Sequence, residues 1–114
     1  MNAWNFRIRS RDRDKETDRR RLDRLAELST TLFHEVRRES DGIRRRYEAA
    51  VGDAAFAMEA QAAESDQRKL EGRIDDLTDT VLSCEARLRD LDVQAEFYQD
   101  ILQRIATYRS SSDV

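Results

Sequence analysis

The sequence contains no proline and only three glycines in 114 residues. Globular domains of this length use these residues in their turns, so few turns and long helical elements are expected. A single cysteine, Cys84, excludes a disulfide within the chain and is typical of a reducing cytoplasm. No apolar run reaches the roughly 18 residues of a membrane span, and the N-terminus lacks the apolar core of a signal peptide.

Catalytic and metal-binding residues are equally scarce. The only histidine, His34, begins a zinc-protease-like His-Glu pair, but Arg38 stands where the second imidazole is needed. One histidine and one cysteine make neither a catalytic triad nor a metal site. Acidic residues alternate between positions 12 and 18 as in a calcium loop, but Thr17 occupies the place of the turning glycine. We therefore predict no enzymatic activity, no cofactor and no metal.

The residues that are present are typical of long helices. Charged and apolar residues each make up 39% of the chain, and Arg, Asp, Glu, Leu and Ala dominate. Arginine outnumbers lysine 19 to 2, which suggests the codon usage of a GC-rich bacterial genome. Residues 1–21 carry eight basic and four acidic side chains, a net charge of +4, so the rest of the chain carries −7 of the total of −3.

The second half of the chain carries an uninterrupted heptad pattern. Its apolar residues alternate in steps of four and three, which predicts a coiled-coil helix with one continuous seam. The seam consists of Leu70, Ile74, Leu77, Val81, Cys84, Leu88, Leu91, Ala95, Tyr98, Leu102 and Ile105.

The first half carries a looser stripe that two serines interrupt. Nine steps cover the 33 residues from Leu25 to Met58, about 3.67 residues per step, which predicts a straighter helix on an eleven-residue repeat. The predicted stripe consists of Leu22, Leu25, Ser29, Leu32, Val36, Ser40, Ile43, Tyr47, Val51, Ala54 and Met58.

The two stripes have nearly equal length, and no seam residue lies between Met58 and Leu70. Ser65 or Asp66 is suited to cap a second helix. We predict an all-α fold of long coiled-coil helices, an antiparallel two-helix hairpin over residues 17–108 with a turn near 62–67. The alternative is one continuous helix of about 90 residues that dimerises in parallel.

The two ends of the chain differ from the stripes. Trp4, Phe6 and Ile8 alternate with polar residues and precede a basic, charge-rich run, so residues 1–16 are predicted to form a flexible or extended arm. Residues 109–114 contain three serines and are predicted to be a disordered tail.

Two sets of residues are candidates for binding a partner. The arm offers Trp4, Phe6 and Ile8, which suit a protein partner, a membrane surface or nucleic acid, although a merely solvated helix start is the alternative. Acidic residues within the arm weaken the phosphate attraction that nucleic-acid binding needs. Apolar residues outside the seam predict a second neighbour, either another copy (a dimer or four-helix bundle) or a foreign protein. This second set consists of Phe33, Val93, Phe97, Ile101 and Tyr108, with Leu28 beside them.

We therefore predict a non-enzymatic, cytoplasmic structural or adaptor protein that docks to a larger assembly through its terminal end. In length and predicted architecture the chain resembles the short coiled-coil stalk proteins of bacterial flagellar and type III export ATPases. The resemblance covers shape and length and no sequence motif, and it implies that the paired termini engage a larger ring. The alternative is a membrane-surface or nucleic-acid-binding module that uses the arm, whose binding would fall steeply with salt.

Overall fold

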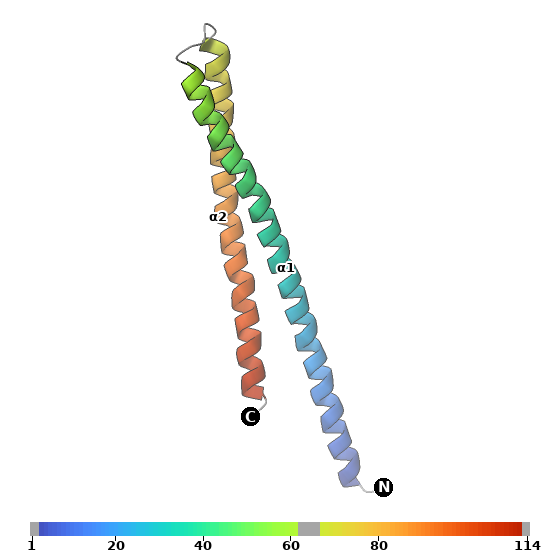
Figure 1. Cartoon of the computed structure of the whole chain (residues 1–114). Helices are drawn as coiled ribbons and strands as arrows, with labels where there is room; N and C mark the ends of the chain where they lie inside the picture. Colours follow the sequence, from blue (N-terminus) through green and yellow to red (C-terminus); the bar gives the residue numbers. More distant parts are fainter. Residues whose placement is uncertain (1–2, 62–66, 113–114) are drawn as a thin grey trace. The chain divides into compact units, whose positions relative to one another are not determined.

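The structure is a computed structural model that describes residues 3–61 and 67–112, with the side chains of residues 10–60 and 67–112. It contains two α-helices, α1 (Ala3–Gln61) and α2 (Gln67–Ser112) (Figure 1). The prediction of an all-α helical hairpin is confirmed, because the described residues form two long helices whose side chains contact each other. The predicted turn, including the cap candidates Ser65 and Asp66, lies outside the described residues.

The chain divides into two compact units, each built from part of both helices. The terminal unit comprises Met1–His34 and Phe97–Val114, and the hairpin unit comprises Glu35–Glu96.

Within the hairpin unit, contacts between side chains define an antiparallel arrangement. Nη2 of Arg87 donates hydrogen bonds to both carboxylate oxygens of Glu39, at 2.8 and 3.1 Å. The hydroxyl of Tyr47 lies 3.4 Å from Oε1 of Glu85. As the residue number rises along α1 it falls along α2, so the two helices run in opposite directions.

The seam of α2 is confirmed in full. All eleven of its predicted residues are buried or half-buried, and Cys84, Leu91 and Ile105 are buried. Leu91 is only 1% exposed, and no other large side chain of the described residues is as fully covered. The regular heptad of the sequence therefore marks the packed face of this helix.

The seam of α1 differs from the prediction. Leu25, Val51 and Met58 are between 42% and 55% exposed, whereas Ala50 and Ala57 are buried. From Leu22 to Ala57, a stripe of residues at steps of four and three is covered at every position, so the predicted eleven-residue repeat is wrong and α1 carries a heptad like that of α2. This stripe consists of Leu22, Ala26, Ser29, Phe33, Val36, Ser40, Ile43, Tyr47, Ala50, Ala54 and Ala57.

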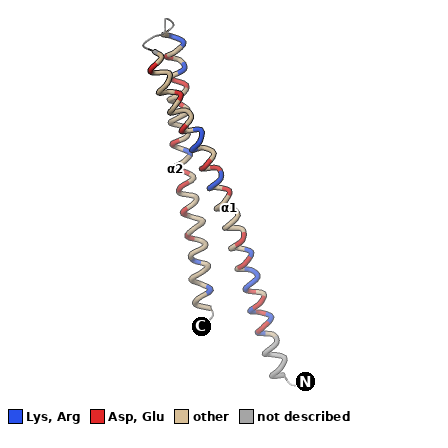
Figure 2. The backbone as a smooth tube through the Cα atoms, in the orientation of Figure 1, with Lys and Arg blue, Asp and Glu red and all other residues tan. Residues whose placement is uncertain are grey.

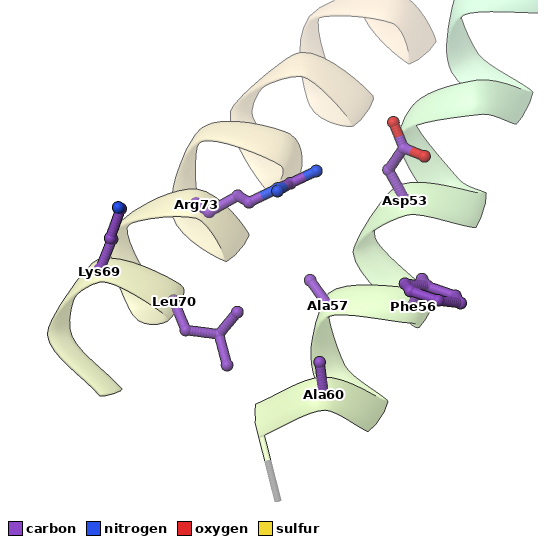
Figure 3. Close-up of a pocket in the computed structure, with 7 residues that line it drawn as sticks. All are labelled: Asp53, Phe56, Ala57, Ala60, Lys69, Leu70 and Arg73. Carbon is purple, nitrogen blue, oxygen red and sulfur yellow. The ribbon is translucent and has the colours of Figure 1, made fainter. Parts of the chain in front are cut away.

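Small side chains in the α1 seam have a simple steric explanation. The α2 seam is mostly Leu, Ile and Val, so alanine and serine on α1 let the helices approach closely without overfilling the space between them. Ala57 and Leu70 line one hollow of the hairpin unit, which shows such a small residue beside a large one (Figure 3). Both seam serines, Ser29 and Ser40, are buried at 3% exposure, in keeping with their small size.

The N-terminal segment is helical where the sequence predicted an extended arm, because α1 begins at Ala3. Ion pairs along one helix favour this: Arg20 contacts Glu16 at 3.1 Å, and Arg21 contacts Asp18 at 3.4 Å. No proline or glycine interrupts residues 3–41, so the helix meets no breaker.

The C-terminal segment is also helical further than predicted, since α2 continues to Ser112. The hydroxyls of Ser110, Ser111 and Ser112 donate hydrogen bonds of 2.9 to 3.1 Å to the carbonyl oxygens four residues earlier. Such bonds satisfy the hydroxyls within the helix, so three serines do not end it here.

Candidate protein-binding surface

In the terminal unit, the helices are joined across the seam by an ion pair. Nη2 of Arg109 lies 2.6 Å from Oδ1 of Asp23. Beyond it, Lys15 and Ser112 line one hollow with Leu22 and Tyr108. Lys15 therefore lies near the last described residue of α2, Ser112, and the residues of α1 before Lys15 extend beyond it. Residues 10–21 are exposed throughout.

The terminal unit also presents apolar side chains that the seam does not use. Leu25, Leu28, Phe97 and Tyr108 are between 47% and 60% exposed. Leu32 and Ile101 are half-buried beside them. We call these six residues the terminal face: Leu25, Leu28 and Leu32 of α1, with Phe97, Ile101 and Tyr108 of α2.

The heptad places all six residues on the same side of the hairpin. Leu25, Leu32 and Ile101 directly precede Ala26, Phe33 and Leu102, which share one seam position of the heptad, and Tyr108 lies one heptad after Ile101. Leu28 and Phe97 lie four residues before Leu32 and Ile101, one turn away on the same side of each helix. Glu39 and Arg87 occupy that same preceding position in the hairpin unit, where they contact each other across the two helices. In the hairpin unit, this contact shows that these edges of α1 and α2 are neighbours. In the terminal unit, Ser29 and Ile105 are buried at the seam and Arg109 pairs with Asp23, so packing of antiparallel helices through the seam leaves one edge of each on the same side. The terminal face is therefore a two-helix surface.

The terminal face is apolar, whereas the part of α1 before it is strongly charged. Figure 2 shows acidic and basic residues alternating along the N-terminal part of α1. Part of this charge is paired within the helix, in the contacts of Arg20 with Glu16 and of Arg21 with Asp18. Paired carboxylates reduce the local positive potential of this segment.

The predicted binding residues do not all lie in one place. Phe97, Ile101 and Tyr108 come together in the terminal face, and Val93 is 67% exposed on the part of α2 that belongs to the hairpin unit. Phe33 is half-buried in the α1 seam and makes an edge contact with the ring of His34, with centroids 5.7 Å apart. Trp4, Phe6 and Ile8 have helical backbone, but their side chains lie outside the described residues.

A second apolar feature, which the sequence did not reveal, lies in the hairpin unit. Phe56 is 76% exposed at the edge of a hollow of about 380 Å³ that Ala57, Ala60 and Leu70 also line (Figure 3). Asp53, Lys69 and Arg73 surround the same hollow with charge. A single aromatic ring offers less apolar area than the terminal face, so the terminal face is the stronger candidate.

Residues of the kind that bind metal ions do not cluster in the described ranges 3–61 and 67–112. These ranges contain no group of three or more His, Cys, Asp or Glu side chains that is placed to hold a metal ion. Cys84 is a free thiol buried in the α2 seam. Neither helix, as far as it is described, has a stretch apolar enough to cross a membrane.

Hydrophobicity alone does not distinguish a seam position from the position beside it, so the sequence pattern places one leucine of the terminal face in the seam. Leu25 was assigned to the seam, but the alanine after it, Ala26, takes that position. The signal that identifies the exposed leucine is the four-three spacing, which runs through Ala26 and not through Leu25. Comparison with protein-family models, with curated proteins and with solved structures finds no match to this chain.

Proposed function

We propose that this chain is a non-enzymatic structural or adaptor protein of the cytoplasm that binds other protein chains through its terminal unit. The observation that carries the proposal is the terminal face, an apolar two-helix surface that lies beside the seam and is not used by it. Exposed apolar patches of this kind mark sites of protein–protein contact. A reducing compartment suits the single buried thiol, Cys84.

The two units have different proposed roles. The hairpin unit acts as a rigid spacer, because its seam is regular and its helices are tied by the Glu39–Arg87 and Tyr47–Glu85 contacts. The terminal unit supplies a small apolar hot spot with Phe97 and Ile101 at its centre, to which Trp4 and Phe6 of the N-terminal segment contribute. The architectural resemblance to export-ATPase stalk proteins agrees with docking through paired termini.

The test compares partner recovery by matched surface variants. Leu28→Glu and Leu82→Glu each place a carboxylate on a leucine that is 56% exposed, but only Leu28 belongs to the terminal face. We expect affinity purification from the source cell, quantified by mass spectrometry, to lose specific protein partners with Leu28→Glu and with Phe97→Glu and to keep them with Leu82→Glu. Equal recovery by all variants would refute a docking role for the face.

A second pair of purifications tests the N-terminal segment. A chain that lacks residues 1–16 is compared with the intact chain at low and at moderate salt. If Trp4, Phe6 and Ile8 contribute apolar contacts, partner recovery falls on truncation and changes little with salt. Steep loss of recovery with salt would instead support the membrane-surface or nucleic-acid alternative.

A further inference from the structure

The terminal unit is only partly covered by its own two helices. Leu22, Tyr98 and Leu102 belong to the seam and are still half-buried, and the terminal face beside them is exposed. Four side chains about half exposed, two of them aromatic, present on the order of 400 Å² of mostly apolar surface. This is about half of the roughly 800 Å² that each partner buries in a stable dimer, and the charged residues around the face would supply the rest.

The charges along each helix indicate what covers this surface. On α1, Arg21 and Glu35 lie one heptad before and one heptad after Leu28, on the same side of the helix. On α2, Asp90 and Arg104 lie one heptad before and after Phe97. Each helix thus carries an exposed apolar residue between two charges of opposite sign.

This arrangement is complementary to itself. When two identical helices meet antiparallel at Leu28, Arg21 of each lies opposite Glu35 of the other, and the pairing occurs twice by symmetry. The same holds for Asp90 and Arg104 around Phe97. A parallel pairing of the same helices would bring like charges together, which disfavours it.

We propose that a second copy of this chain covers the terminal face, with α1 antiparallel to the other copy's α1 and α2 antiparallel to the other copy's α2. The contact forms a four-helix arrangement in which Leu28 and Phe97 lie at the two-fold axis and the flanking charges fix its direction. This inference rests on the proposed function, since it names the occupant of the same surface.

The first experiment measures the mass of the intact chain by sedimentation equilibrium over roughly 1–100 µM, the range in which modest interfaces associate. The expected mass is twice that of the 13.4 kDa chain. Leu28→Glu and Phe97→Glu should give monomers whose circular dichroism stays helical, and Leu82→Glu should stay dimeric. A monomeric wild-type chain over the whole range, or a dimer that survives Leu28→Glu and Phe97→Glu, would overturn the proposal.

The second experiment tests the direction of the pairing by exchanging charges on α2. Asp90→Arg and Arg104→Asp each place like charges opposite one another in the antiparallel dimer, twice by symmetry, so each should raise the dimer Kd about 10-fold. The double variant restores opposite charges and should return the Kd to near the wild-type value. Equal Kd values for the wild type and both single variants would contradict the antiparallel arrangement.

Failure of this inference is distinguishable from failure of the proposed function. If the wild-type chain is monomeric but loses a protein partner with Leu28→Glu, the second copy is refuted while the docking face stands. If the chain is dimeric and partner recovery is unchanged by Leu28→Glu and Phe97→Glu, the dimer is supported and binding of foreign proteins through this face is refuted.

Discussion

Leu91 is the most completely buried large side chain of the described residues, so we expect its substitution to lower the stability of the hairpin strongly. Its side chain is 1% exposed and lies at a seam position of α2. Replacing it by alanine removes three carbon atoms, worth about 2.5 kcal/mol at roughly 0.8 kcal/mol for each buried carbon. The cavity that remains adds to this term, so we expect Leu91→Ala to destabilise the chain by about 3 kcal/mol.

The assay is urea unfolding followed by far-ultraviolet circular dichroism at one fixed chain concentration. With a slope of roughly 1.5 kcal/mol per molar urea, the midpoint should fall by about 2 M. Leu91→Met keeps the volume and should cost less than about 1.5 kcal/mol, which leaves a measurable transition if the alanine variant is already unfolded. Leu82→Ala, at a leucine that is 56% exposed, is the matched control and should change the free energy of unfolding by at most about 0.5 kcal/mol. Equal midpoints for Leu91→Ala and Leu82→Ala would refute the packing described here.

Three further predictions follow from burial and exposure of single residues. Ala50→Leu should destabilise the chain by roughly 1–3 kcal/mol in the same urea assay, because Ala50 is buried and the larger side chain overfills the seam. Val51→Ala should be nearly neutral, because Val51 is exposed. A larger loss of stability with Val51→Ala than with Ala50→Leu would support the eleven-residue repeat instead. Arg87→Ala should cost less than about 1 kcal/mol, and less still at high salt, because both side chains of the Glu39–Arg87 pair are 44% exposed; a loss as large as that at Leu91 would show that this pair holds the helices together. Cys84 should react with a thiol reagent only after urea unfolds the chain, and rapid labelling of the native chain would show that the α2 seam is open.

The sequence predicted α2 far better than α1, and the reason is physical. Every seam residue of α2 is both apolar and correctly spaced, so hydrophobicity and period point to the same face. On α1 they disagree: Val51 is more hydrophobic than Ala50, but the bulky α2 seam leaves room only for the smaller side chain. Fit to an opposing helix is a tertiary property, and a single helix does not encode it in its own hydrophobicity.

Helix ends were the other point of difference. Alternation of Trp4, Phe6 and Ile8 suggested an extended arm, but helix propensity without a breaker carries α1 back to Ala3. Serines at positions 110–112 suggested disorder, but their hydroxyls bond to backbone carbonyls within the last turns of α2. In both places local backbone preferences outweigh the side-chain pattern.

The binding residues were predictable only as a group. An apolar surface wider than the seam was evident from Phe97, Ile101 and Tyr108, and the structure adds Leu25 and Leu32 of α1 to the same side. Which leucine of α1 is exposed depends on the register of the seam, so Leu25 could be assigned only once Ala26 was known to be covered. Phe33 was predicted as exposed surface and occupies a seam position instead.

The central claim is that α1 and α2 of one chain pack antiparallel in a fixed register, and crosslinking of Glu39 to Arg87 tests it most directly. In a Cys84→Ala background, Glu39→Cys with Arg87→Cys places two thiols at positions whose native side chains reach each other, with Nη2 of Arg87 2.8 Å from Oε2 of Glu39. Glu39→Cys with Arg73→Cys, two heptads before Arg87 on α2, is the control. A short bifunctional maleimide should link the first pair within one chain and leave the control pair unlinked. Crosslinks that join separate chains, or equal crosslinking of both pairs, would contradict the hairpin and its register.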